Sequence, residues 1–388
     1  MAHTQPPKIF EPLQVGGMTL SHRIIMSPLT RIRCPNSLPD ALVAEYYAQR
    51  TTPGGLIIGE GTHPSIMAGN FLNVPGMFTL EHVQAWKLVT DAVHAKGGFI
   101  VCQLWHVGRF AVAVQLGGRE PLSSSATNIG LSNRFTPKGR VPTEKSKEMT
   151  PSEIQTTIDE HVHAAKCALE AGFDAVEITM GNGYLCDQFL NSGVNLRADK
   201  YGGSIENRAR FPLELLDAVI AAIQPSKTAV RFSPWGTVLM PLDSDPISTF
   251  SYVLSEVEKR GLAYVCLTQP RTDLFLPEET KWENLHHASD IGAIKAIKDE
   301  ITLKPFFKIL RTTPAFATGG YDDKNCFEEV ESGELNAVTF GRWFISNPDL
   351  VDRIRMGKSL TPWKQESFYA DGAWGYTDYP SADIEVDA

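Results

Sequence analysis

The chain has 388 residues, of which 43% are hydrophobic, and its 45 acidic and 36 basic side chains give a formal net charge of −9. This acidic balance argues against nucleic acid or an anionic membrane as the main partner, because both bind basic surfaces. No apolar run is long enough to span a bilayer and residues 1–7 contain no apolar signal segment, so we expect a cytoplasmic protein.

The cysteines indicate reduced structural thiols. None of the six forms a Cys-x-x-Cys pair, and most lie inside apolar stretches, at Cys34, Cys102, Cys167, Cys186, Cys266 and Cys326. We therefore expect no disulfide framework and no metal site, zinc included.

Eight short apolar segments recur along the chain. Each is too short for an ordinary helix and is apolar almost throughout, as parallel strands buried on both faces are. The predicted strands are 23–30, 55–62, 99–106, 175–181, 228–234, 264–269, 314–320 and 337–343.

Amphipathic helical patterns separate these strands, most clearly at 80–96, 151–170 and 205–223. In 151–170 the apolar residues recur at spacings of three to four, after Thr150 as the predicted N-cap and with Pro151 in the first turn.

Strands that alternate with helices favour either a closed barrel or a doubly wound sheet. The turn after the first strand lacks the Gly-x-Gly-x-x-Gly pattern of a dinucleotide-binding sheet. We therefore predict an α/β fold, a (β/α)8 TIM barrel, as a single domain over 1–388. Residues 107–150, rich in Gly, Ser, Asn and Pro, should form a loop insertion over the rim after the third strand, and 361–388 a C-terminal tail.

Active sites of such barrels assemble where the strands end. Gly319 and Gly320 end the seventh strand, and Gly341 and Arg342 end the eighth. Glycine backbone can approach a phosphate closely and arginine can bind it bidentately, so this pair of ends predicts a phosphate site. Alternatively, the glycines only turn the chain and Arg342 pairs with a surface acid.

The chain as a whole resembles the Old Yellow Enzyme family of FMN-dependent ene-reductases. The similarity covers nearly all of it, from 10–13 to 375–380. It is carried by HRIIMSPLTR (22–31), AEYYAQR (44–50), VPGMFT (74–79), CQLWHVGR (102–109), GNGYLCDQFL (181–190), DKYGGSIENRARF (199–211), TGGYD (318–322) and FGRWFISNPDL (340–350).

The resemblance implies FMN as cofactor and NADPH or NADH as a diffusing reductant that needs no Rossmann domain. It assigns the FMN phosphate to Gly319, Gly320, Gly341 and Arg342. It assigns the flavin ring to Gln103 at the pyrimidine edge, Arg231 at N1 and O2, Thr30 at the O4 region, and Pro28 and Gly61 against the ring plane. A cation near N1 would stabilise the charge that develops on reduction. For Arg231 a structural ion pair is the alternative.

The same resemblance implies a substrate site for an unsaturated small-molecule carbonyl compound. Tyr184 matches the residue that protonates the α-carbon, and a phenol of pKa about 10 suits protonation of a basic enolate. Trp105, Phe368 and Tyr369 match aromatic substrate walls, although all three could equally be rim packing. His63 and His106 match no role and are interpreted as structural.

The sequence departs from the family at the end of the fourth strand. The family carries His-x-x-Asn or His-x-x-His there, to hold the carbonyl oxygen, whereas this chain has Thr179 and Asn182. Losing one such donor can cost roughly 2.7–4 kcal/mol of transition-state stabilisation. Gln269 stands where the family often has glutamate.

Three functions stay open. Net reduction of an activated double bond is the main hypothesis. A redox-neutral isomerase or desaturase of secondary metabolism is the alternative, and a flavin-free barrel that binds a phosphorylated metabolite is the third. The natural substrate, the preferred nicotinamide, the stereochemistry and the oligomeric state do not follow from the sequence.

Overall fold

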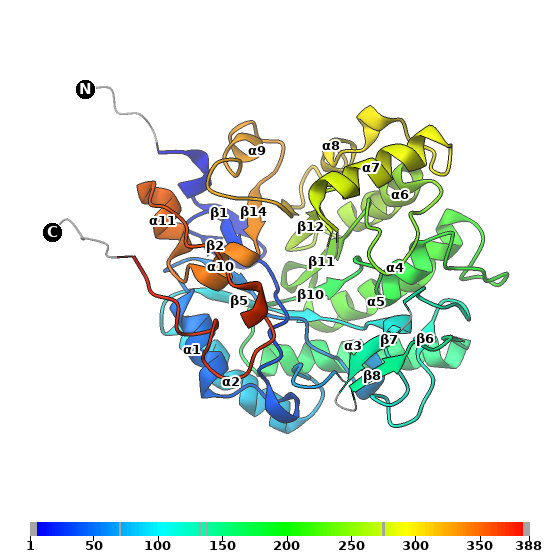
Figure 1. Ribbon diagram of the computed structural model, residues 1–388, viewed down its shortest axis with the longest axis horizontal. Coiled ribbons are helices and arrows are strands. Elements are labelled where there is room, and N and C mark those ends of the chain that lie inside the picture. The colour runs from blue at the N-terminus through cyan, green and yellow to red at the C-terminus, as the bar shows by residue number, and fades with distance from the viewer. Residues whose placement is uncertain (1–5, 70, 132, 137–138, 274–275, 383–388) are drawn as a thin grey trace.

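Eight parallel strands close into a barrel in the computed structural model of the chain, which describes residues 6–69, 71–131, 133–136, 139–273 and 276–382 (Figure 1). Each strand pairs with the next along the chain, and the last pairs with the first. The strands are β3 (Ile24–Met26), β4 (Leu56–Ile58), β5 (Phe99–Leu104), β10 (Ala175–Thr179), β11 (Thr228–Phe232), β12 (Tyr264–Thr268), β13 (Ala315–Thr318) and β14 (Ala337–Phe340). All eight lie inside predicted segments, which confirms the α/β barrel.

The barrel interior is filled by side chains. Its lower part is apolar, with Ile25, Val101, Ala175, Ala229 and Phe316 fully buried in one cluster. A hairpin that the sequence analysis missed, β1 (Leu13–Val15) with β2 (Met18–Leu20), joins this cluster. Its Gly16, at φ +54°, lies so close to the Ser226 carbonyl that a Cβ would come within 2.1 Å of it. The hairpin therefore covers the amino-terminal end of the barrel.

Helices surround the barrel, and the three predicted ones are confirmed as α2 (Leu80–His94), α3 (Pro151–Glu170) and α5 (Ile205–Ile223). Thr150 caps α3 in a capping box with Glu153, because each side chain bonds the other residue's backbone N–H. The other α-helices are α1 (Ala41–Gln49), α4 (Leu185–Leu190), α6 (Pro246–Glu258), α7 (Glu278–Asp290), α8 (Lys304–Phe307), α9 (Glu328–Glu331), α10 (Arg342–Ser346) and α11 (Leu350–Met356). Short 3-10 turns are η1 (Lys8–Phe10), η2 (Pro35–Ser37), η3 (Ile66–Ala68), η4 (Gly108–Phe110), η5 (Pro225–Lys227), η6 (Lys298–Glu300) and η7 (Gln365–Ser367).

Several strands are shorter than predicted at their carboxyl ends. β3 stops at Met26, two residues before Pro28, which has no N–H to give to a neighbouring strand. β4 stops at Ile58, just before Gly59 and Gly61. Thr30 and Gly61 consequently lie on loops at the barrel mouth.

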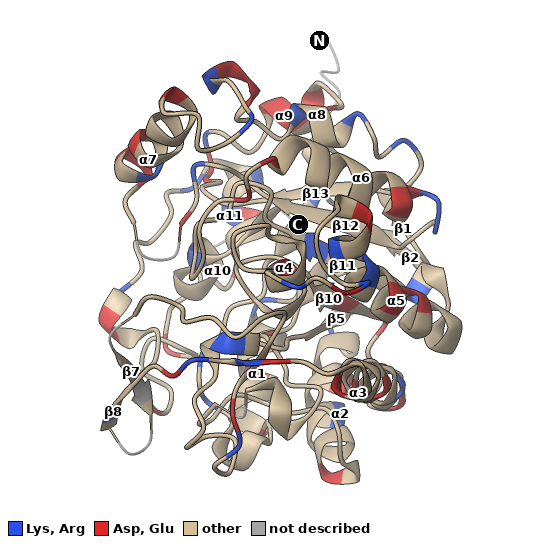
Figure 2. Ribbon diagram, turned by 90° about the vertical axis from the view of Figure 1, so that its right-hand side faces the viewer, with Lys and Arg blue, Asp and Glu red and all other residues tan. Residues whose placement is uncertain are grey.

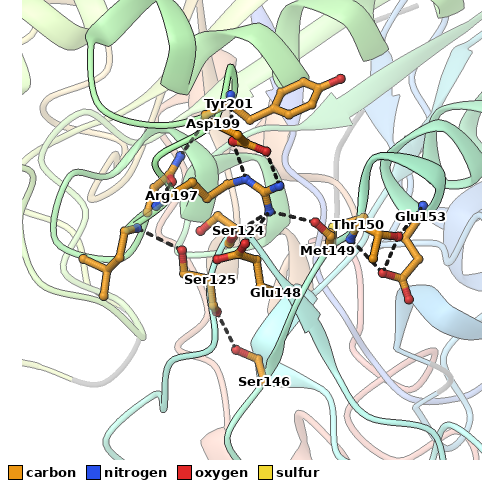
Figure 3. Close-up of polar contacts among 12 residues, drawn as sticks. Ser124, Ser125, Ser146, Glu148, Met149, Thr150, Glu153, Arg197, Asp199 and Tyr201 are labelled. Atoms are coloured by element: carbon orange, nitrogen blue, oxygen red, sulfur yellow. Dashed lines mark hydrogen bonds and ion pairs between the residues drawn. The ribbon is translucent and has the colours of Figure 1, made fainter.

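The predicted rim insertion is more ordered than a loop. It forms the parallel pair β6 (Leu122–Ser123) and β9 (Lys147–Glu148) and the hairpin β7 (Asn133–Thr136) with β8 (Gly139–Pro142), while residues 132 and 137–138 lie outside the described part. One side chain ties the insertion at two points: Arg197 donates to the carbonyls of Ser124 (3.0 Å), next to β6, and Met149 (2.7 Å), next to β9, and it pairs with Asp199 (Figure 3).

Charge is mixed on the outside of the barrel, where blue and red stretches alternate along α3 and α5 (Figure 2). None of the described helices is both long enough and apolar enough to cross a membrane. The predicted tail runs beside α1 and α10, where Gln49 donates to the Thr377 carbonyl and Ser346 to that of Thr361 (Figure 1). Its residues 383–388 lie outside the described part.

Candidate active site

A buried carboxylate, Glu177 on β10, organises the upper layer of the barrel. Its side chain is 0% exposed and accepts hydrogen bonds from Gln103 (Nε2–Oε1, 2.6 Å), Arg231 (Nε–Oε1, 2.9 Å) and Tyr264 (Oη–Oε2, 3.0 Å). These residues come from β5, β11 and β12, so one carboxylate fixes three strands relative to β10. A polar layer thus follows the apolar one toward the carboxyl ends of the barrel strands.

The Arg231 guanidinium is therefore already paired within the chain. Besides Glu177 it reaches the hydroxyl of Ser27 on the loop after β3, at 3.3 Å. Burial alone would lower the pKa of Arg231, but Cys266 and Glu177 outweigh it and the net pKa is raised. The ion pair considered as an alternative is present, and the assignment of Arg231 to the flavin stays a prediction.

The turn after β10 carries Asn182, and the loop after β11 holds it. Asn182 lies in the left-handed region at φ +58°, its backbone N–H donates to Ser233 Oγ (3.1 Å), and Ser233 Oγ donates to its Oδ1 (2.7 Å). Gly181 permits this approach, because a Cβ there would come within 2.6 Å of Ser233 Oγ. With Oδ1 engaged, the carboxamide offers its nitrogen as the remaining polar group.

The same turn is held from below by Asp187 on α4. Its Oδ2 accepts the Gly183 N–H at 2.9 Å, and its side chain is 1% exposed. Burial, together with Asp243 nearby, raises the pKa of Asp187 to about 7. Ser233 and Asp187 therefore fix the turn from two sides, and Tyr184 follows directly as the N-cap of α4.

Tyr184 and Trp105 lie in one aromatic cluster at the mouth. Their rings meet edge to face at 5.1 Å, and Gly61 lies so close to the indole that a Cβ would come within 2.7 Å of it. His63 stacks on Trp105 and donates Nδ1 to the Trp105 carbonyl (3.0 Å), and burial lowers its pKa to about 4. His106 is equally buried and its pKa is lowered by burial. Neither histidine is placed to act as an acid at neutral pH.

The predicted phosphate side is less closely assembled. Gly319 and Gly320, at φ +106° and +68°, pack against Thr272 and Arg271, and Arg271 Nε donates to the Gly319 carbonyl at 3.1 Å. Arg342 is exposed and lies 6.0 Å from the Trp363 ring. No contact between Arg342 and the two glycines is found among the described residues. Arg271 is thus a second cation at this end that the sequence analysis did not identify.

The remaining predicted residues surround the end of β3. A Cβ on Gly341 would meet Leu29, between Pro28 and Thr30, at 3.4 Å. The Phe368 carbonyl accepts a bond from Arg31 at 3.1 Å, which brings the tail to the same place, although the Tyr369 side chain is 64% exposed.

Gln269 now has a physical explanation. Its Nε2 donates to Tyr321 Oη (2.8 Å) and to Glu329 Oε1 (3.1 Å). A glutamate at this position would face the Glu329 carboxylate, so the amide suits the local charge.

Several buried polar atoms at the barrel mouth have no hydrogen-bond partner within the described chain. They lie at the carboxyl ends of β4, β5, β10 and β12 and are Glu60 Oε1, Trp105 Nε1, Thr179 Oγ1, Arg271 Nη2 and Thr272 Oγ1. Buried polar groups seldom stay unpaired. Together with the glycines of β13, this ring of groups fits a polar, phosphate-bearing ligand such as FMN. The described residues form no cluster of three or more His, Cys, Asp or Glu that could hold a metal.

The sequence analysis missed Glu177, Ser233, Asp187 and Arg271. Glu177 carries a signal, since a carboxylate inside the apolar segment AVEIT needs a partner. Arg271 could also have been found, because it closely follows the sixth barrel strand. Ser233 and Asp187 carry no such signal, because their importance depends on which turn they contact.

The barrel has its candidate site at the carboxyl ends of its strands, and comparison with known proteins identifies its class. Residues 8–361 match the NADH:flavin oxidoreductase / NADH oxidase family. The chain is 40% identical to 12-oxophytodienoate reductase 7 of Oryza sativa subsp. japonica, covering 96% of this chain and 94% of that one.

Solved structures are similar over almost the whole chain. An old yellow enzyme homologue from Zymomonas mobilis superposes with a TM-score of 0.87 at 34% identity, covering 97% of this chain and all of that one. Morphinone reductase in complex with tetrahydroNAD gives 0.84 at 37% identity, covering 98% of both. The chain belongs to the Old Yellow Enzyme family. It is an FMN-dependent oxidoreductase of the ene-reductase type, with a nicotinamide as reductant.

Asp187 makes stability depend on pH. Its folded pKa of about 7 lies above the ordinary aspartate value of 3.8, so the folded state binds more protons between those values. Unfolding free energy then falls as pH rises through this window. We expect the wild type to lose stability relative to Asp187→Asn between about pH 4 and 7, measured by urea unfolding at several pH values. The exposed Asp91→Asn serves as control, and parallel profiles of wild type and Asp187→Asn would contradict the shift.

Proposed function

We propose that the enzyme reduces the carbon–carbon double bond of an α,β-unsaturated carbonyl compound with electrons from NADPH or NADH. The observation that carries this proposal is the turn Asn182–Gly183–Tyr184. It puts an amide donor and a phenol two residues apart, fixed by Ser233 and Asp187, beside the Trp105 ring. An oriented donor and an acid are what conjugate reduction requires.

FMN would supply hydride transfer between the nicotinamide and the β-carbon of the substrate. We assign its isoalloxazine to Pro28, Thr30, Gly61, Gln103 and Arg231. Gln103 and Arg231 are held in place by Glu177, so these two donors would need little reorganisation to bind it. Its phosphate is assigned to Gly319, Gly320, Gly341 and Arg342, and the unpaired Arg271 Nη2 adds a cation there.

Asn182 is assigned to the substrate carbonyl. Because Ser233 engages Oδ1, the amide N–H groups are left to donate to the oxygen as negative charge develops. Tyr184 then delivers its phenolic proton to the α-carbon. Trp105, Phe368 and Tyr369 form the walls of the pocket.

Thr179 distinguishes this enzyme from the usual family pattern. Its hydroxyl is buried and has no partner within the described chain, so it can donate to a ligand but on a shorter arm than an imidazole. Weaker enolate stabilisation favours a specialised substrate. The same departure from the family pattern supports a second function, redox-neutral isomerisation, or desaturation with an electron acceptor such as dioxygen to reoxidise the flavin.

The two half-reactions test the proposal. Purified holoenzyme under anaerobic conditions should lose its yellow absorbance when NADPH or NADH is added and regain it with a small cyclic enone. Absence of bleaching with both nicotinamides would exclude the reductase. Product formed without stoichiometric nicotinamide consumption would favour the isomerase.

Removing the phenol of Tyr184 separates the steps. Tyr184→Phe should leave flavin reduction within about twofold of wild type and slow the enone half-reaction by about 10²-fold or more, the usual contribution of a general acid. Stopped-flow absorbance measures both rates, with Tyr252→Phe on the outer helix α6 as control. Equal losses in both half-reactions would instead indicate a structural role for Tyr184.

Placing a histidine at position 179 tests whether a missing hydrogen-bond donor to the substrate carbonyl limits catalysis. Thr179→His should raise kcat/KM for a small cyclic enone, by up to about 10²-fold if the imidazole reaches the oxygen. Thr179→Val, of similar size but without a donor, should not. If the histidine variant is no faster than wild type, the pocket has been reorganised around another substrate pose.

A further inference from the structure

Two buried arginines that directly follow the first barrel strand hold a distant segment of the chain. The C-terminal strap, defined as residues 367–376, carries the aromatic residues assigned to the substrate wall. Arg31 donates to the strap carbonyls of Phe368 (3.1 Å) and Gly375 (2.7 Å). Arg33 donates to the same Phe368 carbonyl (3.1 Å) and to three more, those of Gly372 (3.0 Å), Ser367 (3.1 Å) and Trp374 (2.9 Å).

The carbonyl of Phe368 is the shared acceptor. It receives Arg31 Nε and Arg33 Nη1, both at 3.1 Å, so the backbone of a proposed wall residue lies between the two guanidinium groups. Charge-assisted hydrogen bonds are stronger than neutral ones, and a planar fork also fixes direction. The position of this residue therefore depends on both arginines.

The residue between the arginines is strained. Ile32 has φ +52°, and a β-branched side chain in the left-handed region is a genuine outlier. Such strain persists only where surrounding contacts enforce it, and it concentrates at functional sites. Ile32 also packs against the cluster that contains Trp105 and Tyr184. Residues 31–33 thus contact both the strap, through the two arginines, and the aromatic cluster of Trp105 and Tyr184, through Ile32.

Burying two cations for anchoring alone would be expensive, since Arg31 and Arg33 are 1% and 4% exposed. Their surroundings compensate the charge. Arg31 lies over the rings of Tyr46 (5.3 Å) and Tyr376 (5.1 Å), and Arg33 lies over Tyr376 (4.5 Å). The Glu60 side chain also lies beside the pair, where it accepts the backbone N–H of Arg31 at 3.2 Å. Tyr46 and Tyr376 stack at 3.9 Å, which ties the end of the strap to α1.

We propose that Arg31 and Arg33 are positioning residues that hold the C-terminal strap against the barrel mouth and thereby set the size of substrate that the pocket accepts. The proposal rests on the proposed function in one respect, the assignment of Phe368 and Tyr369 to the substrate wall. Neither arginine takes part in the chemistry.

The test uses the holoenzyme and two substitutions of Arg33, whose guanidinium donates to carbonyls of the strap and to the Arg31 carbonyl. Arg33→Ala removes the fork. Arg33→Lys keeps the charge but not the fork geometry, which guards against a variant that fails to fold. The exposed Arg311→Ala is the control.

Hydrogen–deuterium exchange read by mass spectrometry reports on the strap. We expect peptides over 367–376 to exchange at least about tenfold faster in both Arg33 variants, with barrel-strand peptides and Arg311→Ala unchanged. Calorimetry with two unreactive saturated ketones, cyclohexanone and the bicyclic decalone, reports on the pocket. If the wall is loosened, the bulky ketone should bind better relative to the small one. The ratio of the decalone Kd to the cyclohexanone Kd should then be at least about fivefold lower in the Arg33 variants than in wild type.

Unchanged exchange over 367–376 in both variants would show that Arg33 does not hold the strap and would overturn the proposal. Faster exchange with an unchanged Kd ratio would overturn its role in substrate size. Flavin reduction by NADPH, followed separately, should stay within about twofold of wild type in the variants. If wild type is not reduced at all, the proposed function fails while exchange and ketone binding still judge the strap.

Discussion

The ion pair between Glu177 and Arg231 is the constraint on which the mouth of the barrel depends. Both groups are almost completely buried, so each requires the other and the hydrogen bonds around them. Removing one partner of such a pair leaves an uncompensated charge, at a typical cost of about 3–5 kcal/mol. Because Gln103 and Tyr264 also bond Glu177, the arrangement is specified across four strands. Thr179 is the register partner of Arg231 on the neighbouring strand, so this network also fixes the position of Thr179.

The turn that carries Asn182 and Tyr184 is held next to that layer by different means. Asn182 and Tyr184 belong to a loop, and loops are ordinarily more mobile than the strands that they follow. Here a hydroxyl from the next strand end and a carboxylate from α4 take up the polar groups of the turn. The departure at Thr179 therefore lies beside a rigid partner.

Most of the barrel could be predicted because its strands are apolar on both faces and its helices carry readable caps. Thr150 and Glu153 show this well, since the cap depends on neighbours in sequence. Elements stabilised by distant contacts were missed. Within the rim insertion, β6 and β9 are held beside Arg197, and the β1–β2 hairpin packs against the floor of the barrel.

The candidate site divides in the same way. Strand ends identify Thr179, Asn182, Gln103 and Arg231, because parallel strands bring their carboxyl ends together. The sequence does not reveal that Gln103 and Arg231 meet at Glu177, 74 and 54 residues away along the chain, because strand register decides it. The exposed position of Arg342 likewise follows from side-chain packing and not from the order of strands.

The strap has a consequence for the order in which the molecule is completed. Its carbonyls lie 334 to 344 residues beyond the arginines that they bind. A ribosome making about 5–20 residues per second therefore produces these acceptors tens of seconds after the donors. During that interval Arg31 and Arg33 have none of their strap partners, and the left-handed backbone at Ile32 lacks the contacts that the strap provides on both sides of it. The mouth of the barrel thus takes its final form last, when the two distant parts of the chain meet.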